Sequence, residues 1–253
     1  MKLEEFSQDD FERASKRLVR SLTRGKTTSS QPKAILLGGQ SGAGKTTIHR
    51  VKQREFQGNI IIIDGDSYRS FHPNYLDLQE KYGKDSVDYT KVFAGKMVEY
   101  LVDELSKQGY HLLIEGTLRT TEVPRKTAQL LITKGYQVSL ALIATKPELS
   151  YLSTLIRYEE LYTIDPSQAR ATSKEHHDGI VEHLVDNLWE LEKDKLFNQI
   201  QIFQRDQSCV YDSQVDQISA SEVLHECLFG KWNKVEKEML KIGQERLREL
   251  GEN

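Results

Sequence analysis

A glycine-rich segment in the first fifth of the chain has the residues needed to bind phosphate. It matches the pattern Gly-x-x-x-x-Gly-Lys-[Ser/Thr] and consists of Gly39, Gln40, Ser41, Gly42, Ala43, Gly44, Lys45 and Thr46, with Thr47 next. Glycines let successive backbone N–H groups converge on the β- and γ-phosphates of a nucleotide, Lys45 supplies a positive charge, and the Thr46 hydroxyl can ligate Mg²⁺. An apolar stretch, 34–37, precedes the segment, and a helix-like stretch, 46–56, follows it. This context predicts a phosphate-binding loop that holds a nucleotide with Mg²⁺.

Two carboxylates, Asp64 and Asp66, follow a second aliphatic run at 59–64. Phosphoryl transfer to a hydroxyl needs an acceptor for the hydroxyl proton, and kinases commonly use an aspartate for it. We favour Asp66, which lies further into the loop, as the general base. For Asp64, a role on the metal through water and a contact with substrate are both open, and an alternative is that both aspartates serve Mg²⁺ or cap the next helix.

A third aliphatic run, 111–115, ends in Glu115, and Thr117 and Arg119 come directly after it. Glu115 could hold a Mg²⁺-bound water or a sugar hydroxyl, while Thr117 and Arg119 could contact an acceptor. A purely structural alternative is an ion pair between Glu115 and Arg119.

Two arginines further along, Arg157 and Arg170, could neutralise charge on a transferring phosphoryl group. From their spacing alone, a solvated surface arginine is the more ordinary state of each. Three histidines at 176, 177 and 183 invite a metal site, but their helical spacing does not place them on one face, so a polar first turn is the better interpretation.

The elements that must position these residues alternate along the chain. Buried parallel strands are predicted at 34–37, 59–64, 111–115 and 137–144, and helices at 87–107, 123–134 and 147–162. The pattern indicates an α/β fold, a P-loop NTPase or kinase-like doubly wound and mostly parallel sheet with flanking helices. In such sheets ligands bind beyond the carboxyl ends of the strands, which is where the candidate residues fall.

The ends of the chain add helical extensions to this core. A helix is predicted at 9–22 and a long one at 175–197, in which Trp189 is among the residues expected to be buried. Short strands are expected at 199–203 and 208–211, and a helical tail from 219. The predicted division is an N-terminal helical extension and linker at 1–30, a kinase core at 31–218 and a C-terminal helical tail packed on the core at 219–253, one domain overall.

Composition narrows the possible partners. The 253 residues carry a net charge of −3 without a stripe of Lys and Arg, so neither nucleic acid nor a membrane surface is an expected partner. No stretch is apolar enough for a signal core or a membrane span, and we expect a cytoplasmic protein.

Three motifs together resemble the zeta toxin family of bacterial toxin–antitoxin systems, especially its PezT-type members. They are the phosphate-binding loop, the run Asp64-Gly65-Asp66-Ser67-Tyr68-Arg69 with His72-Pro73-x-Tyr75, and the run Ile114-Glu115-Gly116-Thr117-Leu118-Arg119-Thr120. The likeness covers 31–170, and the second and third motifs are more selective than the first.

The resemblance implies a kinase that transfers the γ-phosphate of ATP to the 3′-hydroxyl of the amino sugar in UDP-N-acetylglucosamine and so blocks peptidoglycan synthesis. It implies that Asp66 is the base and Lys45 the phosphate-binding lysine. It further assigns Glu99, Glu115, Thr117 and Arg119 to the substrate pocket, and Arg157 and Arg170 to the transferring phosphate. A cognate antitoxin that obstructs the ATP site is also implied.

Two other functions remain open on the sequence. The chain could be another small-molecule or polynucleotide hydroxyl kinase with the same aspartate after a strand. It could also be a P-loop ATPase that acts as a conformational switch, which would need no acceptor pocket.

Overall fold

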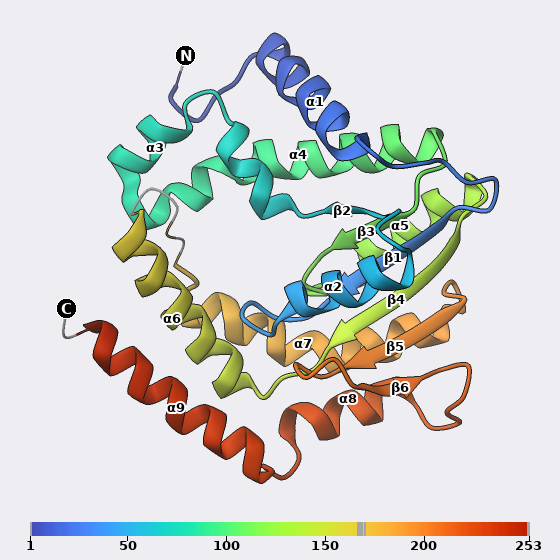
Figure 1. Ribbon diagram of the computed structural model, residues 1–253, viewed down its shortest axis with the longest axis vertical. Coiled ribbons are helices and arrows are strands. Elements are labelled where there is room, and N and C mark those ends of the chain that lie inside the picture. Colours follow the sequence, from blue (N-terminus) through green and yellow to red (C-terminus); the bar gives the residue numbers. More distant parts are fainter. Residues whose placement is uncertain (1, 166–168, 170, 252–253) are drawn as a thin grey trace.

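A computed structural model describes residues 2–165, 169 and 171–251, so Arg170 lies outside the described residues. A six-stranded sheet in the order β2-β3-β1-β4-β5-β6 forms its centre (Figure 1). The strands are β1 (Lys33–Gly38), β2 (Ile61–Ile63), β3 (Leu112–Glu115), β4 (Gln137–Ile143), β5 (Gln199–Phe203) and β6 (Cys209–Asp212). The first five are parallel, and β6 pairs antiparallel with β5. The predicted mostly parallel α/β sheet is therefore confirmed.

Helices connect and cover these strands. They are α1 (Gln8–Thr23), α2 (Lys45–Glu55), the 3₁₀ helix η1 (Gly65–Phe71), α3 (Tyr75–Tyr82), the 3₁₀ helix η2 (Gly83–Asp85), α4 (Ser86–Lys107), α5 (Glu122–Thr133), α6 (Pro147–Ile164), α7 (Lys174–Lys193), α8 (Ala220–Phe229) and α9 (Lys234–Gly251). No helix in the described part of the chain is long and apolar enough to cross a membrane.

The strands are apolar throughout because both faces of the sheet are covered. Along β1, Ala34 and Leu36 join a large cluster with α1, α4, α5, α7 and α8, whereas Ile35 and Leu37 join a smaller cluster with α2. This alternation is what a period of two residues produces in a strand. The two clusters fix the sheet, and the carboxyl ends of its parallel strands form one edge at which loops meet.

The N-terminal segment is packed rather than loosely attached. Leu18 of α1 is buried, and Phe6 and Phe11 form edge-on contacts with the buried Phe93 of α4. The motif residue His72 lies against the same segment, since its Nε2 is 3.2 Å from the carbonyl oxygen of Glu4. In this fold the His-Pro motif therefore anchors the N-terminus to the loop that carries Asp66.

Several predictions about the second half of the chain need correction. Trp189 is half-exposed, because the buried stripe of α7 runs through Ile180, Leu184 and Leu188 instead. The helix also ends at Lys193 rather than 197. His177, assigned to a polar first turn, is completely buried.

The tail is two helices separated at Gly230, not one. The second, α9, lies along α6 (Figure 1), where Arg246 forms an ion pair with Glu160 at 3.3 Å. Its start is a reciprocal cap in which Asn233 and Glu236 each accept a hydrogen bond, at 2.8 Å, from the other residue's backbone N–H. This segment is thus a capped helix terminus.

Candidate active site at the carboxyl edge of the sheet

The phosphate-binding loop joins β1 to α2, as its sequence context predicts. Gly42 and Gly44 have φ angles of +72° and +106°, in the region that favours glycine. The loop is also pressed against α6, because a Cβ atom added at Gly42 would lie 2.0 Å from the backbone oxygen of Ser150. Both features hold the loop in a tight turn in front of the N-terminus of α2, where the helix dipole favours an anion.

A matched pair of substitutions measures this close packing. Gly25 has nearly the same φ, +73°, but nothing within 4 Å of its added Cβ. Gly25→Ala is expected to lower the free energy of unfolding by about 1–2 kcal/mol through backbone strain alone. Gly42→Ala should cost about 1–3 kcal/mol more because of the contact with α6. Urea unfolding of both variants checks this, and equal losses would contradict the predicted packing constraint.

Lys45 lies over the loop and beside the end of β3. Its Nζ donates to the backbone carbonyls of Gly39 at 3.0 Å and Gln40 at 3.3 Å, and it lies 3.7 Å from Oε1 of Glu115. Burial lowers the pKa of the Lys45 ammonium, and Glu115 is the strongest of the carboxylates that oppose this shift. Glu115 therefore pairs with Lys45 and not with Arg119, so the structural alternative weighed on the sequence is wrong.

His49 also contacts Glu115. Its Nε2 lies 2.8 Å from Oε2 of Glu115, at ion-pair distance but without the alignment of a hydrogen bond. Both side chains are largely buried. Sequence reasoning missed His49, although its position four residues after Lys45 places it on the same face of α2.

The two aspartates of the loop after β2, Asp64 and Asp66, lie in different environments. Asp64 accepts hydrogen bonds from the backbone N–H of Asp66 at 3.0 Å and from Ser67 Oγ at 2.7 Å, and it caps η1. Burial raises the pKa of Asp64, and the negative charge of Glu115 raises it further. Asp66 projects into more open space, with 62% of its side chain exposed.

Arg69 orients Asp66. Its Nε donates to Oδ1 of Asp66 at 2.8 Å, while its Nη1 donates to the Val87 carbonyl at 2.7 Å and to Thr90 Oγ1 at 3.1 Å. The guanidinium thus ties the loop to the start of α4. Sequence reasoning missed this pairing, although the spacing of three residues, one turn of the 3₁₀ helix η1, could have indicated it.

Arg157 of α6 lies near the same group of residues. It is exposed, and it lies near enough to Lys45 to contribute to lowering the pKa of that ammonium. Asp66, Asp64 and Glu115 act on the same ammonium in the opposite direction. Residues from four separate elements therefore meet around one point.

A largely apolar cavity of about 930 Å³ lies behind the end of β3, between α4 and α5. Its polar lining residues include Glu99, Glu115, Thr117 and Arg119, the four residues that the family resemblance assigned to the substrate pocket. Val98 lines the cavity too, and a Cβ added at Gly65 would lie 3.1 Å from it, so the cavity adjoins the aspartate loop. Glu99, which is exposed on α4, thus lies in the wall of the same cavity as Glu115, Thr117 and Arg119.

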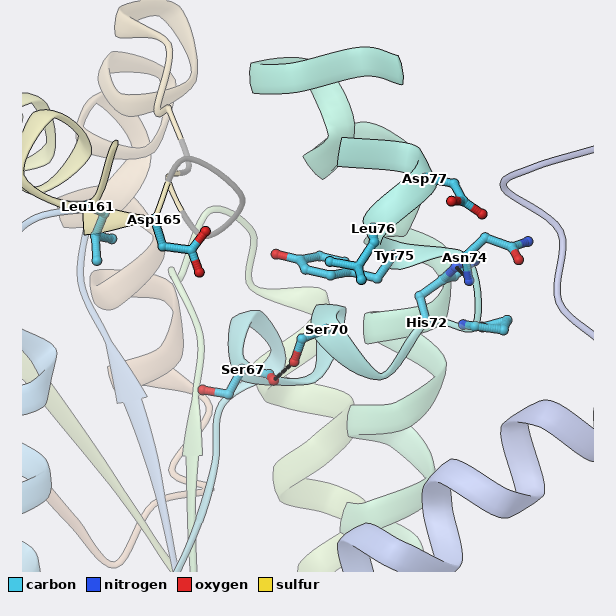
Figure 2. A pocket seen from close by; sticks show the side chains of 10 residues that line it. Ser67, Ser70, His72, Asn74, Tyr75, Leu76, Asp77, Leu161 and Asp165 are labelled. Atoms are coloured by element: carbon cyan, nitrogen blue, oxygen red, sulfur yellow. Dashed lines mark hydrogen bonds between the residues drawn. The ribbon is translucent and has the colours of Figure 1, made fainter. Parts of the chain in front are cut away.

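A second cavity, of about 920 Å³, opens on the other side of the aspartate loop (Figure 2). It lies between the η1–α3 segment and the end of α6, and Figure 2 shows Tyr75 and Asp165 on its opposite sides. Ser67 and Ser70 form its floor next to the aspartate loop. The described residues around it are mostly polar, so this space fits water or a polar part of a ligand better than an apolar one.

Possible metal ligands are spread over several elements. No group of three or more His, Cys, Asp or Glu side chains in the described residues has the geometry of a protein-only metal site. Mg²⁺ needs few direct protein ligands, because it commonly keeps its waters and binds substrate phosphates. The Thr46 hydroxyl at the start of α2, with Asp64 and Glu115 near by, fits that mode. Burial and, after it, the negative charge of Glu115 raise the pKa of Asp64, and a divalent cation near by would favour the charged carboxylate.

A buried polar network supports the loop from behind. Gln40 donates to the Thr145 carbonyl at 2.7 Å and to Ser150 Oγ at 3.2 Å, and Ser150 Oγ is 2.8 Å from Nε2 of His177. His177 Nδ1 is in turn 3.1 Å from Asp178. The arrangement has the connectivity of a hydrolase triad, but Ser150 and His177 have no exposed surface, so no substrate can reach the hydroxyl.

Fold and site define a P-loop protein of the kinase-like class. The family model of the zeta toxin matches residues 18–216, and the chain belongs to the zeta toxin family. Over 250 residues it is 69% identical to toxin PezT of Streptococcus pneumoniae serotype 4 (strain ATCC BAA-334 / TIGR4), covering 99% of both chains. It is 40% identical over 227 residues to toxin zeta of Streptococcus pyogenes, covering 89% of this chain and 79% of that one.

A solved structure from the PezAT chromosomal toxin–antitoxin system of Streptococcus pneumoniae has the same fold. It superimposes with a TM-score of 0.92 at 65% identity, covering 100% of both chains. The family expected from the three motifs is therefore confirmed.

Proposed function

We propose that this protein transfers the γ-phosphoryl group of ATP to the 3′-hydroxyl of the amino sugar in UDP-N-acetylglucosamine. The observation that carries the proposal is the convergence of Lys45, Asp64, Asp66, Glu115 and Arg157 at one edge of the sheet, next to a cavity large enough for a sugar nucleotide. Membership of the zeta toxin family supports the substrate and the toxic outcome, a block in peptidoglycan synthesis. We expect the reaction in the cytoplasm, where ATP is supplied.

In the proposed mechanism the chain positions both reactants and moves one proton. The backbone N–H groups of the loop, with Lys45, hold the β- and γ-phosphates. Asp66 accepts the proton of the attacking hydroxyl as the new phosphorus–oxygen bond forms and the bond to ADP breaks. Arg157, and Arg170 outside the described residues, would neutralise the transferring group.

The remaining site residues would orient the acceptor and the metal. Glu99, Glu115, Thr117 and Arg119 would bind the sugar nucleotide through their hydrogen-bonding groups. Thr46 would ligate Mg²⁺, with Asp64 or Glu115 contacting it through water, and the ion would neutralise charge on the phosphates.

A direct assay tests the reaction. Purified protein is incubated with Mg²⁺, γ-labelled ATP and UDP-N-acetylglucosamine, and mass spectrometry follows the label, with Lys45→Ala as the inactive control. Label in the sugar nucleotide is the expected result. Transfer to other hydroxyl compounds only would indicate a different kinase, and ATP hydrolysis that no sugar nucleotide alters would indicate a switch.

We further propose a cognate antitoxin that covers the ATP site. The support is the likeness to toxin PezT and to a structure from a toxin–antitoxin system. Co-expression provides the test: a neighbouring gene product should restore growth to a host poisoned by this chain, and it should compete with ATP for the purified protein. Failure of every neighbouring gene to restore growth would contradict the proposal.

A further inference from the structure

One guanidinium outside the phosphate-binding loop bonds two of the loop's carbonyl groups. Arg205 lies in the turn after β5, and its Nε donates to the carbonyl oxygen of Ala43 at 3.2 Å. Its Nη2 donates to the carbonyl oxygen of Gly42 and, at 2.9 Å, to Ser153 Oγ of α6. The same side chain therefore joins the loop, α6 and the β5–β6 turn.

The backbone of a phosphate-binding loop makes such a partner necessary. When N–H groups of the loop face an anion, the carbonyls of the same peptides face away from it and need donors elsewhere. Lys45 serves the carbonyls of Gly39 and Gln40, and Thr145 Oγ1 donates to that of Ala43 at 2.8 Å. Of the described residues that donate a side-chain hydrogen bond to the loop, Arg205 alone bonds the Gly42 carbonyl.

Arg205 is itself held rigidly. Its turn is closed by the Gln204 N–H, which donates to the Ser208 carbonyl at 2.9 Å, and Asp206 accepts from both the N–H and the hydroxyl of Ser208. Burial lowers the pKa of the Arg205 guanidinium. No carboxylate in the described part of the chain lies within ion-pair distance of it, and its hydrogen bonds there go to carbonyl and hydroxyl oxygens. A half-buried cation with only neutral acceptors gives up hydration without gaining an ion pair, so its hydrogen bonds to the loop and to Ser153 must offset that cost.

We infer that Arg205 is a positioning residue for nucleotide binding, which fixes the phosphate-binding loop in the conformation that receives the β- and γ-phosphates. The planar fork of arginine reaches two successive carbonyls and Ser153 together, which a lysine ammonium on a flexible stem cannot reproduce. The inference rests on the nucleotide-binding part of the proposed function and not on the identity of the acceptor.

The test compares Arg205→Lys with Arg246→Lys, a control at an exposed arginine of α9. Calorimetry with Mg²⁺ and ADP should show binding about 10- to 100-fold weaker for Arg205→Lys and unchanged for the control. In kinetics the loss should appear in KM for ATP more than in kcat, since Arg205 does not touch the reacting atoms. Added ethylguanidinium should restore part of the ADP affinity of Arg205→Ala.

Hydrogen exchange separates this inference from the proposed function. Without nucleotide, amides of residues 39–47 should exchange faster in Arg205→Lys, while those of α5 and α9 keep the wild-type rate. If the wild-type protein bound no ADP, nucleotide binding would be refuted and selective exchange in the loop would still support the positioning role. If the loop amides of Arg205→Lys exchanged at the wild-type rate, or if amides throughout that variant exchanged faster, the positioning role of Arg205 would be refuted.

Discussion

Asp66→Asn is expected to slow phosphoryl transfer to UDP-N-acetylglucosamine about 10²- to 10⁴-fold, the usual contribution of a general base. Asparagine has nearly the shape of aspartate and can still accept a hydrogen bond from Arg69, but it cannot take up the hydroxyl proton. ATP binding should change little, because the proposed contacts of ATP are to the loop and Lys45. Steady-state kinetics with both substrates saturating, together with calorimetry for ATP, measure the two quantities.

Asp88→Asn is the matched control for that substitution. Asp88 is an exposed carboxylate of α4 that pairs with Lys91 at 3.2 Å, much as Asp66 pairs with Arg69 three residues on. It should retain wild-type transfer. If Asp66→Asn retained transfer within about tenfold of wild type, below the range for a general base, Asp66 would not be that base.

The same assay resolves the roles that the sequence left open for Asp64 and Asp66. Asp64 is the more buried of the two and sits in the field of Glu115, which raises its pKa. A carboxylate in that position gains most from a nearby Mg²⁺. Asp64→Asn should therefore raise the Mg²⁺ concentration needed for half-maximal transfer, whereas Asp66→Asn should lower the rate at every Mg²⁺ concentration.

Strand periodicity and strand-end chemistry made much of this site predictable. Aliphatic runs identify parallel strands, and the topology rule places whatever follows them at one edge, so Lys45, Asp64 and Glu115 were expected near each other. The structure brings them together. Their individual roles in catalysis remain predictions.

What the sequence did not reveal depends on contacts between distant segments. Arg205 follows a strand like the other candidates, but a lone arginine in a polar turn carries no signal of the loop it bonds, more than 160 residues earlier. The helical pattern around Glu99 gave no sign of the pocket to which the family resemblance assigned it, because the cavity forms only where α4 lies beside the end of β3. The prediction that Trp189 is buried was wrong for a different reason. Helical spacing indicates which face of a helix is buried, but it does not show how wide the buried stripe is.

Arg157→Gln is expected to reduce kcat about 10³- to 10⁵-fold, the loss seen when an arginine that neutralises a transferring phosphoryl group is removed. Arg157 is exposed on α6, and no ion pair holds it among the described residues. It nevertheless lies close enough to Lys45 for its positive charge to contribute to lowering the pKa of the Lys45 ammonium. The carboxylates of Glu115, Asp66 and Asp64 offset part of this repulsion at Lys45, and a bound phosphate would interact favourably with both cations.

The distribution of the loss between kcat and KM decides how Arg157 acts. A residue that binds the phosphoryl group chiefly in the transition state lowers kcat and leaves KM for ATP nearly unchanged. Arg248→Gln, at an exposed arginine of α9, is the control for loss of a surface charge and should behave as wild type. A raised KM for ATP with a normal kcat would mean that Arg157 binds ATP in the ground state. Wild-type values of both kcat and KM would mean that Arg157 is a solvated surface arginine with no part in the reaction. We expect a lower kcat with a nearly unchanged KM for ATP. The positive charges of Arg157 and Lys45 lie near each other before nucleotide binds, and the negative charge on the transferring phosphoryl group would interact favourably with both.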